Sequence, residues 1–194
     1  MFKTKQIQKF NFMFIIHIFF FSCDEEIERN NITDYGIVIN EINYNSSDDF
    51  DPDDWVELYN HSNDTIDLSG WLFKDENNDH LYILPQGIIM PPDQYLVICK
   101  DIVKFTEVFT EVNVYHGDFM FGLGGGGDQI RLFDSSGLLS DRVEYNDDPP
   151  WPTIVDGQGP TLELRNPLLD NAKWQSWSAS QGYGSPGEIN STYE

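Results

Sequence analysis

The chain has 194 residues, which allows one domain of ordinary size or two very small ones. Hydrophobic side chains make up 40 % of it, enough to bury a core, and 33 acidic residues against 11 Lys and Arg give a formal net charge of −22. This charge would repel a phosphate backbone, so we expect no nucleic-acid partner, while divalent cations, basic partners and simple solubility all stay compatible with it.

The first segment, residues 1–22, has the composition of a signal peptide. Three lysines precede an apolar run over residues 10–22, and the first acidic residue is Asp24. The run is shorter than the roughly 20 residues that a membrane-spanning helix needs. It ends in FFSC, which resembles the lipobox where bacterial lipoproteins are acylated on cysteine and cleaved, so we expect lipidation at Cys23. An uncleaved anchor and an ordinary secretory signal are the alternatives.

Residues 23–35 form an acidic and polar stretch that begins with DEE directly after Cys23. This composition predicts a flexible tether. Its acidic start resembles the surface-export signal of lipoproteins in some Gram-negative lineages, and a merely soluble linker is the alternative. We therefore expect an exported, lipid-anchored protein of the bacterial cell envelope, at the outer-membrane surface if the export signal operates.

The remaining segment, residues 36–190, is predicted to fold as one all-β domain. Short runs rich in β-branched and aromatic residues recur between turn signals, and almost no long helical period is present. This spacing is typical of a sandwich or a barrel. The runs are residues 36–44, 55–60, 65–74, 80–84, 94–100, 128–133, 139–145 and 161–165.

Local patterns refine this prediction. Residues 55–60 and 129–134 alternate apolar and polar side chains, so we expect each to bury one face only. Residues 101–112 are the one helical candidate. Cys99 lies in the apolar run YLVIC and is predicted to be a buried hydrophobe without a disulfide partner, because Cys23 would be acylated.

The predicted strands carry landmarks that together resemble the lamin tail domain, an immunoglobulin-like β-sandwich found in nuclear lamins and in many bacterial extracellular proteins. Each landmark is weak alone, but their order and gaps match, and the resemblance covers about residues 36–190. It implies an immunoglobulin-like β-sandwich and much less about function, because a fold carries function only through its sites. The landmarks are residues 39–42 (INEI), 55–60 (WVELYN), 67–71 (DLSGW), 127–134 (GDQIRLFD), 141–145 (DRVEY) and 184–187 (GSPG).

An acidic loop over residues 46–54 (SSDDFDPDD) lies between two predicted strands. Like charges held this close repel, and a hard divalent cation bound through oxygen ligands relieves the repulsion. We therefore predict a calcium site here, without the spacing of an EF-hand, and a solvated acidic loop is the alternative. Its ligands would be Asp48, Asp49, Asp51, Asp53 and Asp54.

Three tryptophans, Trp151, Trp174 and Trp177, lie in the final third of the chain, which is rich in glycine, proline and polar residues. Exposed aromatic side chains of this kind stack on sugars or anchor a partner, so they are candidate binding residues. The alternative is that they cap the open ends of the sandwich.

No catalytic motif is evident in the sequence. His61, His80 and His116 lack metal or triad spacing, and the glycine-rich run 122–127 lacks the lysine of a phosphate-binding loop. We therefore expect a non-catalytic, lipid-anchored binding module with an unknown protein or polysaccharide partner. The alternatives are a calcium-stabilised carbohydrate-binding module and a small hydrolase that uses carboxylates.

Overall fold

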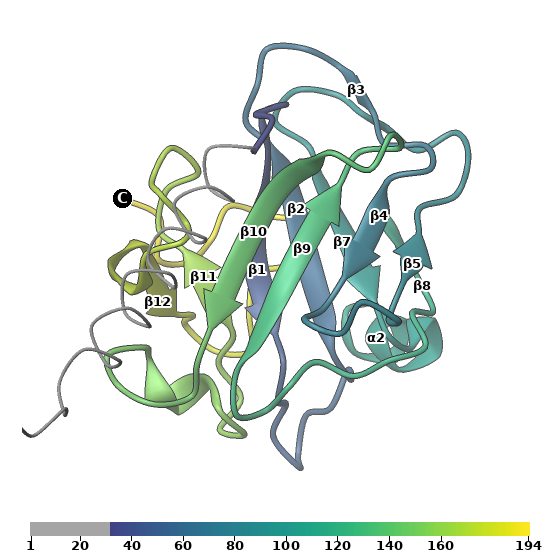
Figure 1. Ribbon diagram of the computed structural model, residues 1–194. Coiled ribbons are helices and arrows are strands. Elements are labelled where there is room, and N and C mark those ends of the chain that lie inside the picture. Colours follow the sequence, from purple (N-terminus) through teal and green to yellow (C-terminus); the bar gives the residue numbers. More distant parts are fainter. Residues whose placement is uncertain (1–31) are drawn as a thin grey trace, which may run out of the picture. The chain divides into compact units, whose positions relative to one another are not determined.

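Two β-sheets face each other in the structure, a computed structural model that describes residues 32–194 (Figure 1). Residues Thr33–Glu194 form one unit. The predicted signal peptide, Cys23 and most of the predicted tether lie outside the described residues, so these predictions stay predictions. The fold of the unit confirms the predicted all-β sandwich.

The larger sheet has six strands, and all its neighbours are antiparallel except the last pair. In spatial order they are β12 (Trp177–Ala179), β11 (Leu162–Leu164), β1 (Ile37–Asn43), β2 (Trp55–Asn60), β7 (Tyr95–Cys99) and β8 (Tyr115–Gly117). The smaller sheet consists of β10 (Leu139–Tyr145), β9 (Asp128–Phe133), β4 (Leu72–Lys74) and β5 (Tyr82–Ile83). A separate pair is formed by β3 (Ile66–Asp67) and β6 (Ile89–Met90).

Each of the eight predicted runs contains at least one of these strands. The strands β6, β8 and β12 were not predicted, and each has only two or three residues. The predicted helix is present but shorter, as α2 (Ile102–Val108), because its chain turns at Phe109. Two turns of 3-10 helix, η1 (Thr153–Val155) and η2 (Trp174–Ser176), complete the described elements.

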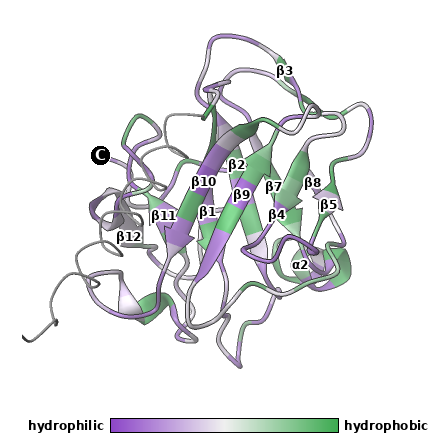
Figure 2. Cartoon of the chain, viewed as in Figure 1, coloured by the Kyte–Doolittle hydropathy of each residue, from purple (hydrophilic) through white to green (hydrophobic). Residues whose placement is uncertain are grey.

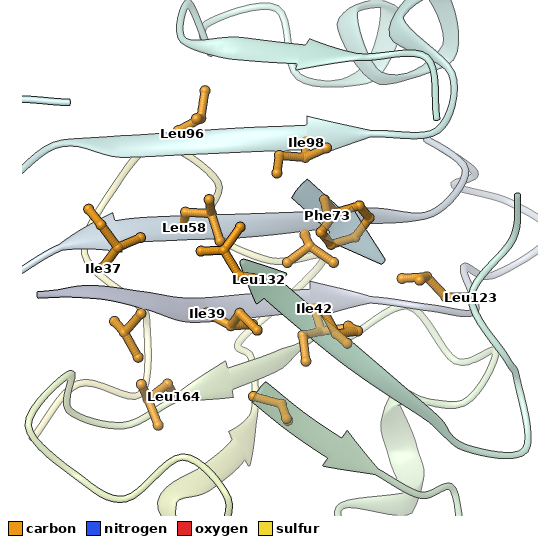
Figure 3. Close-up of a cluster of buried hydrophobic side chains, with 14 of the residues drawn as sticks. Ile37, Ile39, Ile42, Leu58, Phe73, Leu96, Ile98, Leu123, Leu132 and Leu164 are labelled. Carbon is orange, nitrogen blue, oxygen red and sulfur yellow. The ribbon is translucent and has the colours of Figure 1, made fainter. Parts of the chain in front are cut away.

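The main hydrophobic core fills the space between the two sheets (Figure 3). Leu58 of β2 and Ile98 of β7 project from the large sheet, and Phe73 of β4 and Leu132 of β9 project from the small one. All four are fully buried. Burying such a side chain contributes about 1.5–3 kcal/mol, so this layer is the main source of stability for the sandwich.

The prediction that β2 buries only one face was wrong. Strand β9 does alternate between buried and half-buried residues, and it carries both hydrophobic and hydrophilic segments in Figure 2. In β2, however, Trp55 and Glu57 are buried on the side away from the core. The reason is that α2 covers Trp55 and Cys99 with Phe105, in a second apolar cluster.

Cys99 is buried in this second cluster, as predicted. Burial raises the pKa of its thiol to about 12, and its Sγ lies 3.3 Å from the carbonyl oxygen of His116. The thiol is therefore protonated at neutral pH, which suits a packed hydrophobe and not a nucleophile.

One buried carboxylate, Asp141 of β10, joins the two sheets. The register of β1 shifts between Ile39 and Glu41, and the backbone N–H of Ile39 donates to Oδ2 of Asp141 at 2.7 Å. Asn171 donates its side-chain amide to the same oxygen at 2.8 Å. Burial raises the pKa of Asp141 to about 6, so the group is ionised at neutral pH and two buried donors depend on it.

We predict that Asp141→Ala lowers the free energy of unfolding by about 2–4 kcal/mol, because it leaves two buried N–H donors without an acceptor. Denaturant unfolding at pH 7 measures the change. The control is Asp79→Ala, which alters an exposed side chain and is expected to stay within about 0.5 kcal/mol of the wild type. Equal stability of the two variants would show that Asp141 does not join the sheets.

Candidate functional site

The candidate site lies on the outer face of the six-stranded sheet, the face turned away from the core. Side chains alternate along a strand, so Val56 and Leu58 enter the core while Trp55, Glu57 and Tyr59 project to the outer face. Trp55 lies under α2, Glu57 lies under the end of the chain, and Tyr59 lines an open groove. The outer face therefore has an apolar part, a carboxylate part and an aromatic part.

Three glutamates lie side by side in the carboxylate part. Glu41 of β1 is the registered partner of Glu57 in β2 on one side and of Glu163 in β11 on the other. All three are fully buried. Three neighbouring carboxyl groups without water need hydrogen-bond donors, because an unpaired buried charge is very costly.

The donors come largely from residues 184–194, which we call the C-terminal segment. The N–H of Ser185 donates to Oε1 of Glu41 at 3.1 Å, and its hydroxyl donates to Oε1 of Glu163 at 2.8 Å. The N–H of Gly187 donates to Oε2 of Glu57 at 2.5 Å. Further donors to Glu163 are the hydroxyl groups of Ser191 and Thr192.

Gly184 lets the C-terminal segment approach this closely. Its φ is +97°, and a Cβ atom added there would lie 2.6 Å from Oε1 of Glu41. Both the backbone conformation and the contact therefore require glycine. The landmark GSPG at residues 184–187 thus brings hydrogen-bond donors to the glutamates.

Burial is the main cause of the unusual ionisation of this row. It raises the pKa of Glu57 to about 8, and the charge of Glu163 acts in the same direction. Burial and the neighbouring charges of Glu57 and Glu163 also raise the pKa of Glu41 well above its ordinary value. The donors that reach Glu41 and Glu57 are neutral amides and hydroxyls, so these two groups hold protons at neutral pH.

This ionisation predicts a pH-dependent stability. A carboxyl with a raised pKa in the folded state binds more protons when folded, so the free energy of unfolding is largest below the ordinary value near 4.5. It falls as pH rises through the folded pKa, with a slope of up to about 1.4 kcal/mol per pH unit for each group. We therefore expect the wild type to lose stability between pH 5 and about pH 8.

The variant Glu41→Gln should reduce this slope by on the order of 1 kcal/mol per pH unit. Its amide oxygen can still accept from Thr161 and Ser185, and its amide nitrogen can donate to the Ser185 hydroxyl, 3.5 Å from Oε2 in the wild type. Denaturant unfolding across this pH range measures the slope. The control is Glu144→Gln, which changes an exposed side chain. If stability falls with pH as steeply in Glu41→Gln as in the control, the raised pKa of Glu41 is contradicted.

The aromatic part of the outer face is an open groove of about 170 Å³, which we call the tyrosine groove. Tyr59 and Tyr95 stack with ring centroids 4.7 Å apart, and Tyr193 of the C-terminal segment also lines the groove. Asn40 and Asn190 form the floor. The C-terminal segment therefore covers the glutamates and builds one wall of the groove.

The polar atoms of the groove floor are already engaged. Asn40 donates its side-chain amide to Glu57 and to Asn190, both at 2.8 Å. Asn190 donates in turn to the carbonyl oxygens of Asn40 and Leu164. At the rim, the Tyr59 hydroxyl donates to Asp93 at 3.0 Å, and burial together with this bond raises the pKa of Tyr59 to about 12.

The acidic loop predicted to bind calcium is held by two lysines. Nζ of Lys100 lies 2.7 Å from Oδ1 of Asp53 and 3.7 Å from Oδ2 of Asp54. Nζ of Lys104, in α2, lies 2.9 Å from Oδ2 of Asp51. In addition, Phe50 of the loop stacks on Tyr183, with ring centroids 4.0 Å apart. Sequence reasoning missed these lysines because they come from a segment some 50 residues further along the chain.

Within residues 32–194, no group of three or more His, Cys, Asp or Glu side chains is placed to hold a metal ion. The calcium site stays a prediction, and the lysines favour the alternative of an acidic loop without metal. A second acidic stretch, residues 75–79, contains Asp75, whose carboxylate oxygen Oδ2 lies 2.6 Å from Nδ1 of His80. In the part of the chain that the structure describes, His61 and His116 pair with no acidic side chain.

The three predicted binding tryptophans have different environments. Trp177 is buried in the core and donates its Nε1–H to the carbonyl oxygen of Asn171, so it supports the capping alternative. Trp151 is half-buried, and its ring centroid lies 6.3 Å from that of Trp177. Trp174 is 42 % exposed and is the most exposed of the three, so it keeps the largest free surface for the predicted contact with a sugar or a partner.

The glycine-rich run 122–127 is a connection fixed by carboxylates. Asp54 accepts from the N–H of Leu123 and Asp128 accepts from the N–H of Gly124, each at 2.8 Å. Carboxylates directed at the backbone N–H groups leave them unavailable to a phosphate, in agreement with the absence of a phosphate-loop motif.

The glutamate row and the tyrosine groove were not predicted. The sequence carries one signal for the row, since each glutamate stands inside an apolar strand motif, in INEI, WVELYN and TLEL. A charged residue at the centre of such a run is normally paired when buried. The groove has no comparable signal, because its lining residues come from five separate parts of the chain.

Among the described residues, no helix is long and apolar enough to span a bilayer. In a comparison with protein families, the model described as Lamin Tail Domain matches residues 33–147. No match was found among curated proteins. The family match contains Glu41 and Glu57 but ends before Glu163 and the C-terminal segment.

Proposed function

Because the chain belongs to the lamin tail domain family, we propose that it is a non-catalytic interaction module, held at the bacterial cell envelope by a lipid on Cys23. The family match supports an interaction module as the general role. The envelope location, the anchor and the binding surface are our own inferences from the residues.

The observation that carries the proposed binding role is the tyrosine groove. Tyr193 is 57 % exposed and Ile189, beside it in the C-terminal segment, is 66 % exposed, although both belong to a wall held by buried hydrogen bonds. Rigid aromatic side chains around a concave surface are typical anchors of binding partners. The groove therefore offers a preformed contact surface for a protein partner, and a polysaccharide is the alternative.

The lining of the groove supports a non-catalytic role. Hydrolysis by carboxylates needs two acidic groups facing one open site. No Asp, Glu, His, Cys or Lys is among the residues that line this groove in the described part of the chain. The buried carboxyl group of Glu57 accepts from Asn40, which lines the groove, and from the N–H of Gly187.

The proposed anchor rests on the sequence before the sandwich. Cys23 follows the apolar run of the predicted signal peptide, and the acidic residues after it give a tether between the lipid and the sandwich. A tether of this kind would let the module meet partners at the outer-membrane surface.

Metabolic labelling with a tagged fatty acid tests the anchor. We expect the wild type and Cys99→Ala to be labelled in a bacterial host, and Cys23→Ser to remain unlabelled, because acylation needs the Cys23 thiol. Cys99→Ala is the matched control, since Cys99 is buried. Equal labelling of Cys23→Ser and the wild type would reject the anchor.

Photo-crosslinking from the groove tests the binding role. A photoreactive amino acid at position 193 should yield a discrete crosslinked species in cells, because this side chain lines the groove. The same amino acid at position 138, which is exposed in the hairpin between β9 and β10, should yield none. Identical products from both positions, or no product from either, would contradict a partner at the groove.

A further inference from the structure

We infer that the tyrosine groove binds the side chain of a lysine or an arginine from a basic protein segment. This inference rests on the proposed function, since it names the chemistry of the partner that the interaction module would recognise. Three features of the groove carry it: its charge, its free aromatic surface and the state of its floor.

The charge of the groove favours a cation. No Lys, Arg or His lines it within the described residues, and Asp93 stands at its rim, bonded to the Tyr59 hydroxyl. Arg165 directly follows the groove residue Leu164 in the chain, and its guanidinium pairs with the Glu194 carboxylate at 3.0 Å. With a net charge of −22 on the whole chain, an anionic ligand would be repelled and a basic segment attracted.

The tyrosines supply surface that suits an alkyl stem with a cationic end. Their ring faces are electron-rich, and a Lys or Arg head within about 6 Å of such a face is attracted to it. The hydroxyl groups of Tyr95 and Tyr193 have no hydrogen-bond partner in the described part of the chain, so they are free to accept from an ammonium or a guanidinium.

The floor argues against a sugar. A glycan needs polar side chains free to bond with its hydroxyl groups, in addition to an aromatic face. In this groove the amides of Asn40 and Asn190 bond to each other, to Glu57 and to backbone carbonyl oxygens. A ligand that uses ring faces and negative charge fits better than one that needs a directional polar floor.

The test uses the full chain, acylated and purified in detergent, at one fixed ionic strength. Three probes are titrated: an oligolysine peptide, an oligoglutamate peptide and a neutral oligosaccharide. NMR follows the side-chain amide signals of Asn40 and Asn190, which report on the groove floor. We expect saturable shifts with oligolysine and none with the other two probes.

Variants separate the groove from general attraction to an acidic protein. We expect Tyr193→Ala and Asp93→Asn each to weaken oligolysine binding about three- to fivefold, while Tyr193→Phe retains the ring face and stays within about twofold. Asp93→Asn leaves the C-terminal segment untouched and suits the φ of 59° at this position. Glu144→Gln removes one exposed charge from β10 and is the matched control, with less than about a twofold effect.

Two results would overturn the inference. The first is oligolysine binding that is unchanged in both Tyr193→Ala and Asp93→Asn, which would make it non-specific. The second is a shift of the Asn40 and Asn190 signals by the oligosaccharide and not by oligolysine. If either result were found together with a specific crosslink from position 193 in cells, the groove would still be a binding site. Only the inference that it binds lysine or arginine would then be wrong.

Discussion

A carboxyl group that leaves water must find other donors, and this requirement organises the outer face of the large sheet. Glu41, Glu57 and Glu163 are neighbours across three strands, and no strand of either sheet covers them. The C-terminal segment does so, and one of its backbone N–H groups donates to each of the three. The last residues of the chain are therefore part of the fold, and the sandwich is incomplete without them.

The same segment determines where the protein can be contacted. Asn190, which holds the segment to β1 and β11, forms the groove floor, and Tyr193 forms a wall. The hydrogen bonds that satisfy the buried glutamates thus also preorganise the groove. A rigid concave aromatic surface loses little conformational entropy on binding, which makes it an effective place for a partner to dock.

Charge is distributed unevenly over the molecule. Lys100 and Lys104 form ion pairs with the acidic loop, through Asp51, Asp53 and Asp54. Within residues 32–194 the glutamate row pairs with no cation: Glu41 and Glu57 hold protons, and neutral N–H and hydroxyl groups donate to all three glutamates. Among the described residues, neither basic nor acidic side chains line the tyrosine groove, so the proposed preference for a cation follows from the ring faces and from the acidic surroundings.

The sequence by itself determined most strands of the sandwich and the burial of Cys99, because apolar alternation and turn residues are local signals. It also carried the family landmarks, including GSPG at residues 184–187. Only the tertiary structure decided that β2 is covered on both faces, that lysines close the acidic loop and that Trp177 lies inside. These outcomes depend on segments that are distant in sequence, and local periodicity contains no information on which segment will cover a given face.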